Sequence, residues 1–143
     1  MEFSDFSAVI SQWCEQNSPA PLDCWIDEAN ARLVVIEGGV RCSIDILDPY
    51  DARDPLRVAA MLSQGGASVA CDCDGALGID PDTHCLTLLN WRPGPGSPEA
   101  LMDRLEGLAN QRAAMLSLLE TYLRDSAVSV PGRGTNNAWQ PGV

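Results

Sequence analysis

The stretch from Arg32 to Ile46 constrains the fold most, because it contains two strand-like runs on either side of a turn. Arg32 to Glu37 is rich in β-branched residues, and Val40 to Ile46 alternates apolar with polar side chains. Gly38-Gly39, between the runs, is a two-residue hairpin signal. The pattern predicts two antiparallel strands with one face toward water.

Further strands are expected on both sides of this hairpin. Leu22 to Asp27 also alternates and predicts a strand before it. A second group of three strands is expected from Ala67 to Trp91, with turns at Asp74-Gly75 and at Asp80 to Thr83. The last strand of this group is apolar on both faces, so we expect it to be covered on both.

A helix is predicted at the N-terminus, and a second, shorter helix is predicted in the middle of the chain. Phe3, Phe6, Ile10 and Trp13 recur at helical spacing. The second helix has Asp54 as its cap, runs over Leu56 to Gln64 and is expected to end at Gly65-Gly66. Its apolar side chains lie almost all round it, so it must be buried on two sides, one of which could be another subunit.

A third helix is predicted after a loop that is rich in proline and glycine. Ser97 is its expected cap and Pro98 its first residue. An apolar pattern with a seven-residue repeat continues to about Asp125 and is interrupted by Arg112.

These elements together predict a single α+β domain. Its antiparallel twisted sheet carries three helices, in the order α-β-β-β-α-β-β-β-α. The domain is expected to span residues 1–125, and residues 126–143 are expected to form a flexible tail that contains Trp139.

The charge of the chain argues against partners that carry negative charge. There are 20 acidic and 9 basic residues, and the formal net charge is −11. Nucleic acid and anionic membranes are therefore unfavourable partners, whereas a basic or uncharged partner is favoured. No apolar run approaches the length of about 20 residues that a membrane span needs, and the acidic N-terminus is unlike a secretory signal. A cytoplasmic location is expected.

No residue pattern points to catalysis. His84 is the one histidine, and the sequence has no nucleophile elbow, phosphate-binding loop or metalloprotease helix. The acidic residues are scattered through turns and strand faces. We therefore expect a protein that is not an enzyme and has no cofactor.

A metal- or redox-dependent regulatory domain is the alternative interpretation. Cys71, Cys73, His84 and Cys85 are four soft ligands in 15 residues. The spacing argues against convergence, because adjacent His84 and Cys85 in a strand would point to opposite faces. In a reducing compartment the cysteines are better interpreted as small buried apolar residues. These are Cys14, Cys24, Cys42, Cys71, Cys73 and Cys85.

The order of elements resembles that of the class I type III secretion chaperones, also called the Tir-chaperone family. The segment Asp-Gly-Ala-Leu-Gly-Ile-Asp-Pro-Asp-Thr-His-Cys-Leu-Thr-Leu-Leu from Asp74 to Leu89 is similar to the family's pattern of a strand, an Asp-rich turn and a Leu-x-Leu strand. A helix like the one predicted from Ser97 follows in the family. The likeness covers about residues 3–125. The chain departs from the family by lacking a mid-helix aromatic residue and by its extra tail.

The resemblance implies a cytoplasmic homodimer, in a Gram-negative bacterium, that binds the N-terminal region of a secreted effector. The effector segment would wrap around the dimer in an extended form that stays soluble and competent for export. By the family pattern, the first helix and the first strands form the effector-binding groove, and the short helix forms the dimer interface; core packing is the alternative role for each of these residues. The implied effector-binding residues are Phe6, Ile10, Trp13, Trp25, Leu33 and Val35. The implied dimer-interface residues are Leu56, Val58, Met61 and Leu62.

Overall fold

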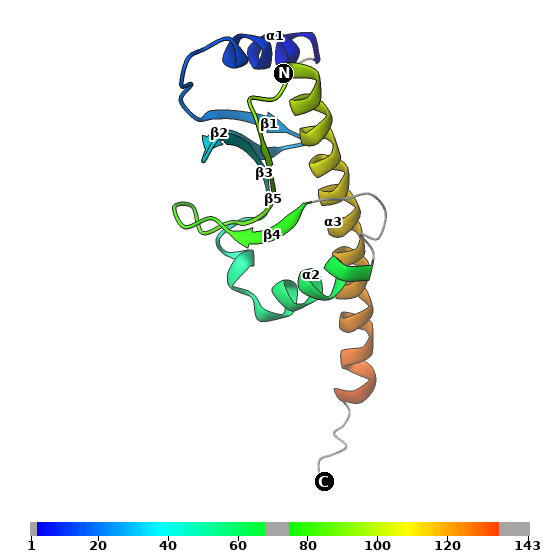
Figure 1. The fold of residues 1–143 in the computed structure, drawn as a ribbon. Coiled ribbons are helices and arrows are strands. Elements are labelled where there is room, and N and C mark those ends of the chain that lie inside the picture. The colour runs from blue at the N-terminus through cyan, green and yellow to red at the C-terminus, as the bar shows by residue number, and fades with distance from the viewer. Residues whose placement is uncertain (1–2, 68–74, 135–143) are drawn as a thin grey trace.

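The computed structural model describes residues 3–67 and 75–134, which form one sheet and its helices (Figure 1). The order of elements, α-β-β-β-α-β-β-α, agrees with the predicted α+β class. The helices are α1 (Phe3–Cys14), α2 (Pro55–Ala67) and α3 (Pro98–Gly134), with a short 3-10 turn, η1 (Asp51–Arg53), before α2. The strands are β1 (Leu22–Ile26), β2 (Ala29–Ile36), β3 (Gly39–Leu47), β4 (Ala76–Ile79) and β5 (Leu86–Pro93).

The described strands form one antiparallel sheet in the spatial order β1-β2-β3-β5-β4. The predicted antiparallel arrangement is therefore confirmed. Within the described residues, two strands, β4 and β5, follow α2, whereas three were expected. The remaining predicted strand, with Cys71 and Cys73, falls on residues 68–74, outside the described part of the chain.

Two-residue turns join β1 to β2 and β2 to β3. Asp27 and Glu28 have φ values of 50° and 65°, and Glu37 and Gly38 have values of 51° and 75°. Two consecutive positive φ angles are typical of the turn type whose twist matches paired strands. The second turn is therefore one residue earlier than Gly38-Gly39, and Gly39 is instead the first residue of β3.

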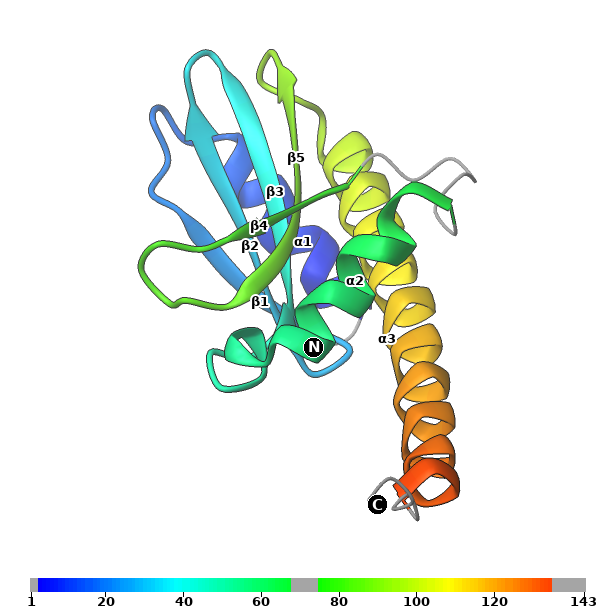
Figure 2. The ribbon, with the colours of Figure 1, turned by 90° about the horizontal axis from the view of Figure 1, so that it is seen from below.

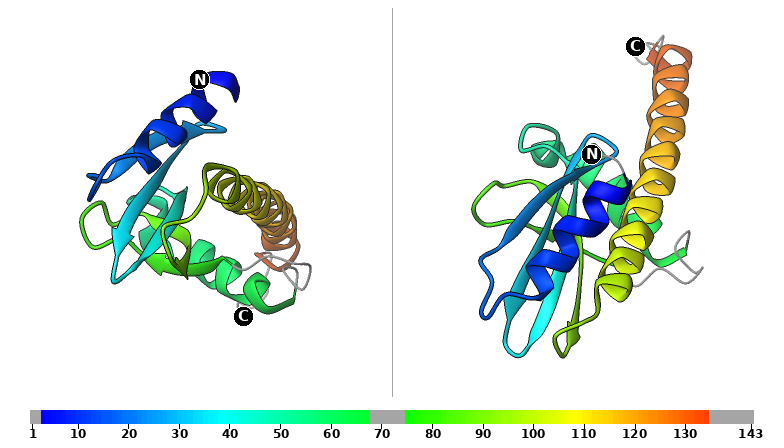
Figure 3. Two further views of the ribbon diagram at one scale, coloured as in Figure 1. Left: turned by 45° about the horizontal axis from the view of Figure 1, so that its top comes forward. Right: turned by 90° about the horizontal axis from the view of Figure 1, so that it is seen from above.

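Helices α1 and α3 lie together on one face of the sheet (Figure 3). Ile10 and Trp13 of α1 are buried with Leu33 of β2 and Ile44 of β3. The indole N–H of Trp13 donates to the carbonyl of Ala20 at 2.7 Å, which satisfies its one polar atom inside the core. Burial of this apolar face is the main force that holds α1 on the sheet.

Helix α2 packs against α3 and β4 (Figure 2). Asp54 caps it as predicted, because its carboxylate accepts the backbone N–H of Leu56 at 3.0 Å and also pairs with Arg57. The predicted end at Gly65-Gly66 is wrong, since α2 continues to Ala67. Glycine permits a helix to end but does not require it.

Helix α3 begins as predicted, with the hydroxyl of Ser97 accepting the N–H of Ala100 at 3.1 Å. It continues to Gly134, past the predicted end near Asp125, and extends beyond the sheet (Figure 1). Arg112, which interrupts its apolar pattern, donates to the carbonyl of Asp45 at 2.7 Å and to that of Asp27 at 3.3 Å. The interruption is thus a polar link between α3 and the sheet. Within the described residues, no helix is long and apolar enough to span a membrane.

Candidate functional site

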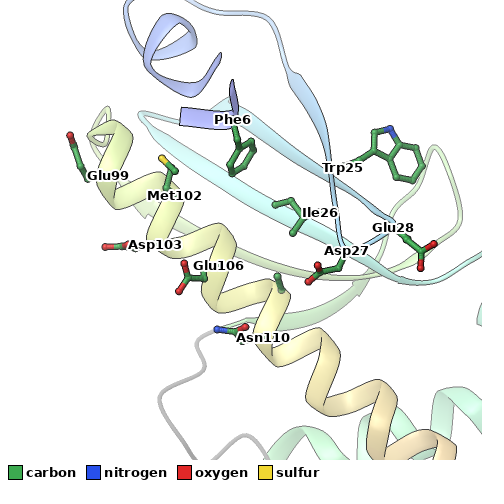
Figure 4. A pocket seen from close by; sticks show the side chains of 11 residues that line it. Phe6, Trp25, Ile26, Asp27, Glu28, Glu99, Met102, Asp103, Glu106 and Asn110 are labelled. Carbon is green, nitrogen blue, oxygen red and sulfur yellow. The ribbon is translucent and has the colours of Figure 1, made fainter. Parts of the chain in front are cut away.

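A groove of about 630 Å³ lies between the end of β1, the start of α1 and the first half of α3 (Figure 4). The groove thus lies between the first and the last helix of the chain, α1 and α3, which share one face of the sheet. The lining residues are Phe6, Trp25, Ile26, Asp27, Glu28, Glu99, Met102, Asp103, Glu106, Ala109 and Asn110.

The interior of the groove is apolar. Phe6 and Ile26 are half-buried, and Met102 faces them from α3 (Figure 4). Trp25, at the end of β1, is 66 % exposed. An exposed tryptophan beside an apolar hollow is a typical feature of surfaces that bind another chain.

The rim of the groove is acidic. Glu99, Asp103 and Glu106 follow at steps of four and three residues, so they form one stripe along α3. Asp27 and Glu28 occupy the β1–β2 turn on the other side (Figure 4). Within the described chain, no arginine lines the groove, and none of these five carboxylates forms an ion pair.

The β1–β2 turn is held in place from α3. The guanidinium of Arg112 donates to the backbone carbonyl of Asp27, which connects the turn to the middle of the helix. Asp27 and Glu28 keep left-handed backbone angles that favour glycine. The chain therefore has carboxylates at two positions where glycine would be the less strained residue.

The strand next to the groove, β1, is an edge strand that pairs only with β2 in the described sheet. Its exposed Asp23 accepts two hydrogen bonds from Arg32 of β2, at 2.7 and 3.1 Å. These bonds lower the pKa of Asp23 and favour its charged form. The other side of β1 presents backbone groups that can accept an additional strand.

A second, smaller hollow of about 330 Å³ lies at the opposite end of α1. It is formed by the end of α1, the loop that follows, the β2–β3 turn and the loop before α3. Among the residues that the structure describes, no charged residue lines it. The lining residues are Trp13, Cys14, Gln16, Ser18, Pro19, Val35, Gly38, Gly39, Val40, Gly94 and Pro95.

The six residues implied by the family resemblance for effector binding are distributed over both hollows and the core. Phe6 and Trp25 line the larger groove, whereas Trp13 and Val35 line the smaller hollow. Ile10 and Leu33 are fully buried in the core and line neither hollow. The family resemblance implies acidic side chains around the groove that suit a basic client, but not which ones. The structure places those of α3 and of the β1–β2 turn there, and the spacing of Glu99, Asp103 and Glu106 is visible in the sequence.

The four residues implied for dimerisation differ in exposure. Leu56 and Leu62 of α2 are 44 % and 60 % exposed, and Ala59 between them is also exposed. Their three-residue steps place these three side chains on one side of the helix. Met61 is fully buried against the body of the chain, and Val58 is half-buried.

Part of the cysteine–histidine cluster lies outside the described residues, because Cys71 and Cys73 fall in the segment 68–74. His84 is exposed in the turn before β5, where its backbone N–H donates to the backbone carbonyl of Asp80 at 2.8 Å. Cys85 is buried, and burial raises the pKa of its thiol. Burial also raises the pKa of the Cys24 thiol, in that case to about 11. Raised pKa values disfavour the thiolate that metal binding and redox exchange need. Over residues 3–67 and 75–134, no group of three or more potential metal ligands converges.

Comparison with known proteins identifies the fold. No family model matches the chain, and no curated protein matches it in sequence. A chain of the ExsC–ExsE complex superposes with a TM-score of 0.57 at 12 % identity, covering 83 % of this chain and 97 % of that one. A chain of the heterodimeric ExoU–SpcU complex from the type III secretion system of Pseudomonas aeruginosa has a TM-score of 0.51 at 20 % identity, covering 80 % and 98 %.

A chain of the HopA1–SchA chaperone–effector complex is similar over 80 % of this chain and 97 % of that one, with 14 % identity and a TM-score of 0.48. The first two superpositions cover nearly all of the matched chains. The protein has the fold of the class I type III secretion chaperones that its sequence resembles.

Proposed function

We propose that this protein is a cytoplasmic type III secretion chaperone that acts without catalysis. It binds the N-terminal region of a secreted effector as a homodimer and keeps that region soluble and competent for export. The observation that carries the proposal is the 630 Å³ groove, apolar inside and open to solvent, on the fold of secretion chaperones.

The groove and the edge strand together suit an unfolded client. An extended chain exposes apolar side chains, which Phe6, Ile26 and Met102 can cover. It also exposes backbone N–H and C=O groups, which the unpaired side of β1 can bind by strand addition. The smaller hollow beside Val35 can take a further apolar side chain of the client.

The direct test is coexpression with the product of the neighbouring gene, since such chaperones are often encoded beside their client. The expected result is a stable complex whose client N-terminus is protected from protease but gives no folded-state signal of its own. Deleting that N-terminal region should abolish the complex. A client that binds through its folded domain alone would contradict the proposal.

The exposed stripe of α2 is the proposed contact between two copies, and Leu62→Arg tests it. Leu62 is 60 % exposed, so the isolated chain should tolerate the charge and remain folded. In a dimer the same charge would be buried without a partner. We expect the dimer to weaken by at least about a hundredfold, measured as a monomer mass by light scattering with an unchanged circular dichroism spectrum.

Val35→Arg is the matched control, because Val35 is 45 % exposed but lies on β2, at the smaller hollow. This variant should remain dimeric. A wild-type chain that is monomeric at micromolar concentration, or a dimer that survives Leu62→Arg, would show that α2 is not the dimer contact.

A further inference from the structure

The negative charge of the groove's rim affects which client segments the groove can bind. Rim carboxylates come from two elements that are distant in the sequence, the β1–β2 turn and the first half of α3, and both elements border the same hollow (Figure 4). All five are exposed, and over the described chain none is neutralised by an ion pair. Arg112, at this end of the sheet, donates to backbone carbonyls.

Repulsion within the acidic stripe on α3 raises the free energy of the chain when no client is bound. Like charges at steps of three and four residues repel each other on a helix surface, and this applies to Glu99–Asp103 and to Asp103–Glu106. Glu99 also lies in the first turn of α3, where the helix dipole stabilises a negative charge. Asp103 and Glu106 lie beyond that turn, so no feature of the isolated helix compensates for their repulsion.

We infer that the groove is specific for an extended client segment in which a large apolar residue is flanked by lysine or arginine. The apolar side chain would occupy the space between Phe6, Ile26 and Met102, and the basic side chains would pair with Asp103 and Glu106. The Cα atoms of Asp103 and Glu106 are about 5 Å apart along the helix axis, which an extended segment spans in about two residues, the spacing of two positions that flank one apolar residue. The inference rests on the proposed function, because it assumes that an unfolded client occupies the groove.

The variant that tests this selectivity is D103N/E106Q, which keeps the shapes of both side chains and removes two charges. The matched control is E120Q/D125N, which removes two charges from exposed positions further along the same helix, outside the groove. Both variants change the net charge equally, so a general field effect would affect them alike.

The probes are labelled short peptides that share one apolar sequence and carry arginine, glutamine or glutamate at two flanking positions. Wild type and the control are expected to bind the arginine peptide about tenfold more tightly than the glutamine peptide, since each rim pair contributes a few-fold in affinity. This ratio should fall to about two in D103N/E106Q. The preference should also weaken as salt is added.

Thermal unfolding separates selectivity from damage to the fold. D103N/E106Q should melt at the same temperature as wild type or higher, because the substitution removes a like-charge repulsion. Equal binding of arginine and glutamate peptides by wild type, an unchanged ratio in D103N/E106Q, or no binding of any peptide would overturn the inference. Copurification of the client would still support the proposed function in each of those cases.

Discussion

Replacing Trp25 with alanine is expected to weaken binding of the client's N-terminal segment by about thirtyfold. Trp25 is the most exposed aromatic side chain of the groove, and tryptophan side chains that become buried on binding often contribute about 2 kcal/mol. Because the side chain is 66 % exposed in the isolated chain, the free energy of unfolding should change little. Titration of the purified client segment would measure the first effect, and urea unfolding the second.

Tyr50→Ala is the control for this experiment. Tyr50 is 83 % exposed, in the loop between β3 and η1, and lines neither hollow. Its removal should leave both affinity and stability at wild-type values. If Trp25→Ala bound the client segment as tightly as wild type, Trp25 would not be an anchor, and the client would have to bind elsewhere.

Repetitive patterns made most of the fold predictable. The alternation in Val40 to Ile46, the capping residues Asp54 and Ser97, and the helical spacing of Phe6, Ile10 and Trp13 all predicted elements that the structure confirms. These signals are local, since a strand period or a helix cap depends on residues close together in the chain.

Details that depend on contacts between distant residues could not be predicted in this way. Arg112 breaks the apolar repeat of α3. It does so because its guanidinium binds two backbone carbonyls, one on β3 and one in the β1–β2 turn, and these come close to it only in the folded chain. Arg104 is similar, since its guanidinium donates to the backbone carbonyl of Val40 at 2.7 Å and to the side-chain oxygen of Asn90. Both are long side chains with several donors, which can reach the sheet from the helix.

The candidate site was predictable only in part for the same reason. A periodic pattern shows that Ile10, Leu33 and Trp25 are apolar or aromatic, but not which of them stays exposed after the sheet and helices pack. The structure buries Ile10 and Leu33 and exposes Trp25. The acidic rim requires that the β1–β2 turn and α3 come together, which no local pattern in either segment indicates.

Replacing Gly39 with alanine is expected to destabilise the chain by about 3 kcal/mol, because a new methyl group in a filled space forces backbone or ring to move. A Cβ atom at Gly39 would lie 2.6 Å from two ring carbons of Trp91 and would also collide with the backbone carbonyl of Arg92. The indole cannot easily withdraw, since its N–H donates to the carbonyl of Ile36 at 2.9 Å. Urea unfolding would measure the loss.

Gly38→Ala, at the neighbouring position, separates this collision from backbone strain. Gly38 has a φ of 75° and open space around the position of a Cβ, so alanine there should cost only about 1 kcal/mol. The difference between the two variants should shrink when Trp91 is also replaced with alanine, because the ring that Gly39 accommodates is then gone. Equal losses for both glycines, or an unchanged difference without Trp91, would show that close packing under the indole is not the reason for glycine at position 39.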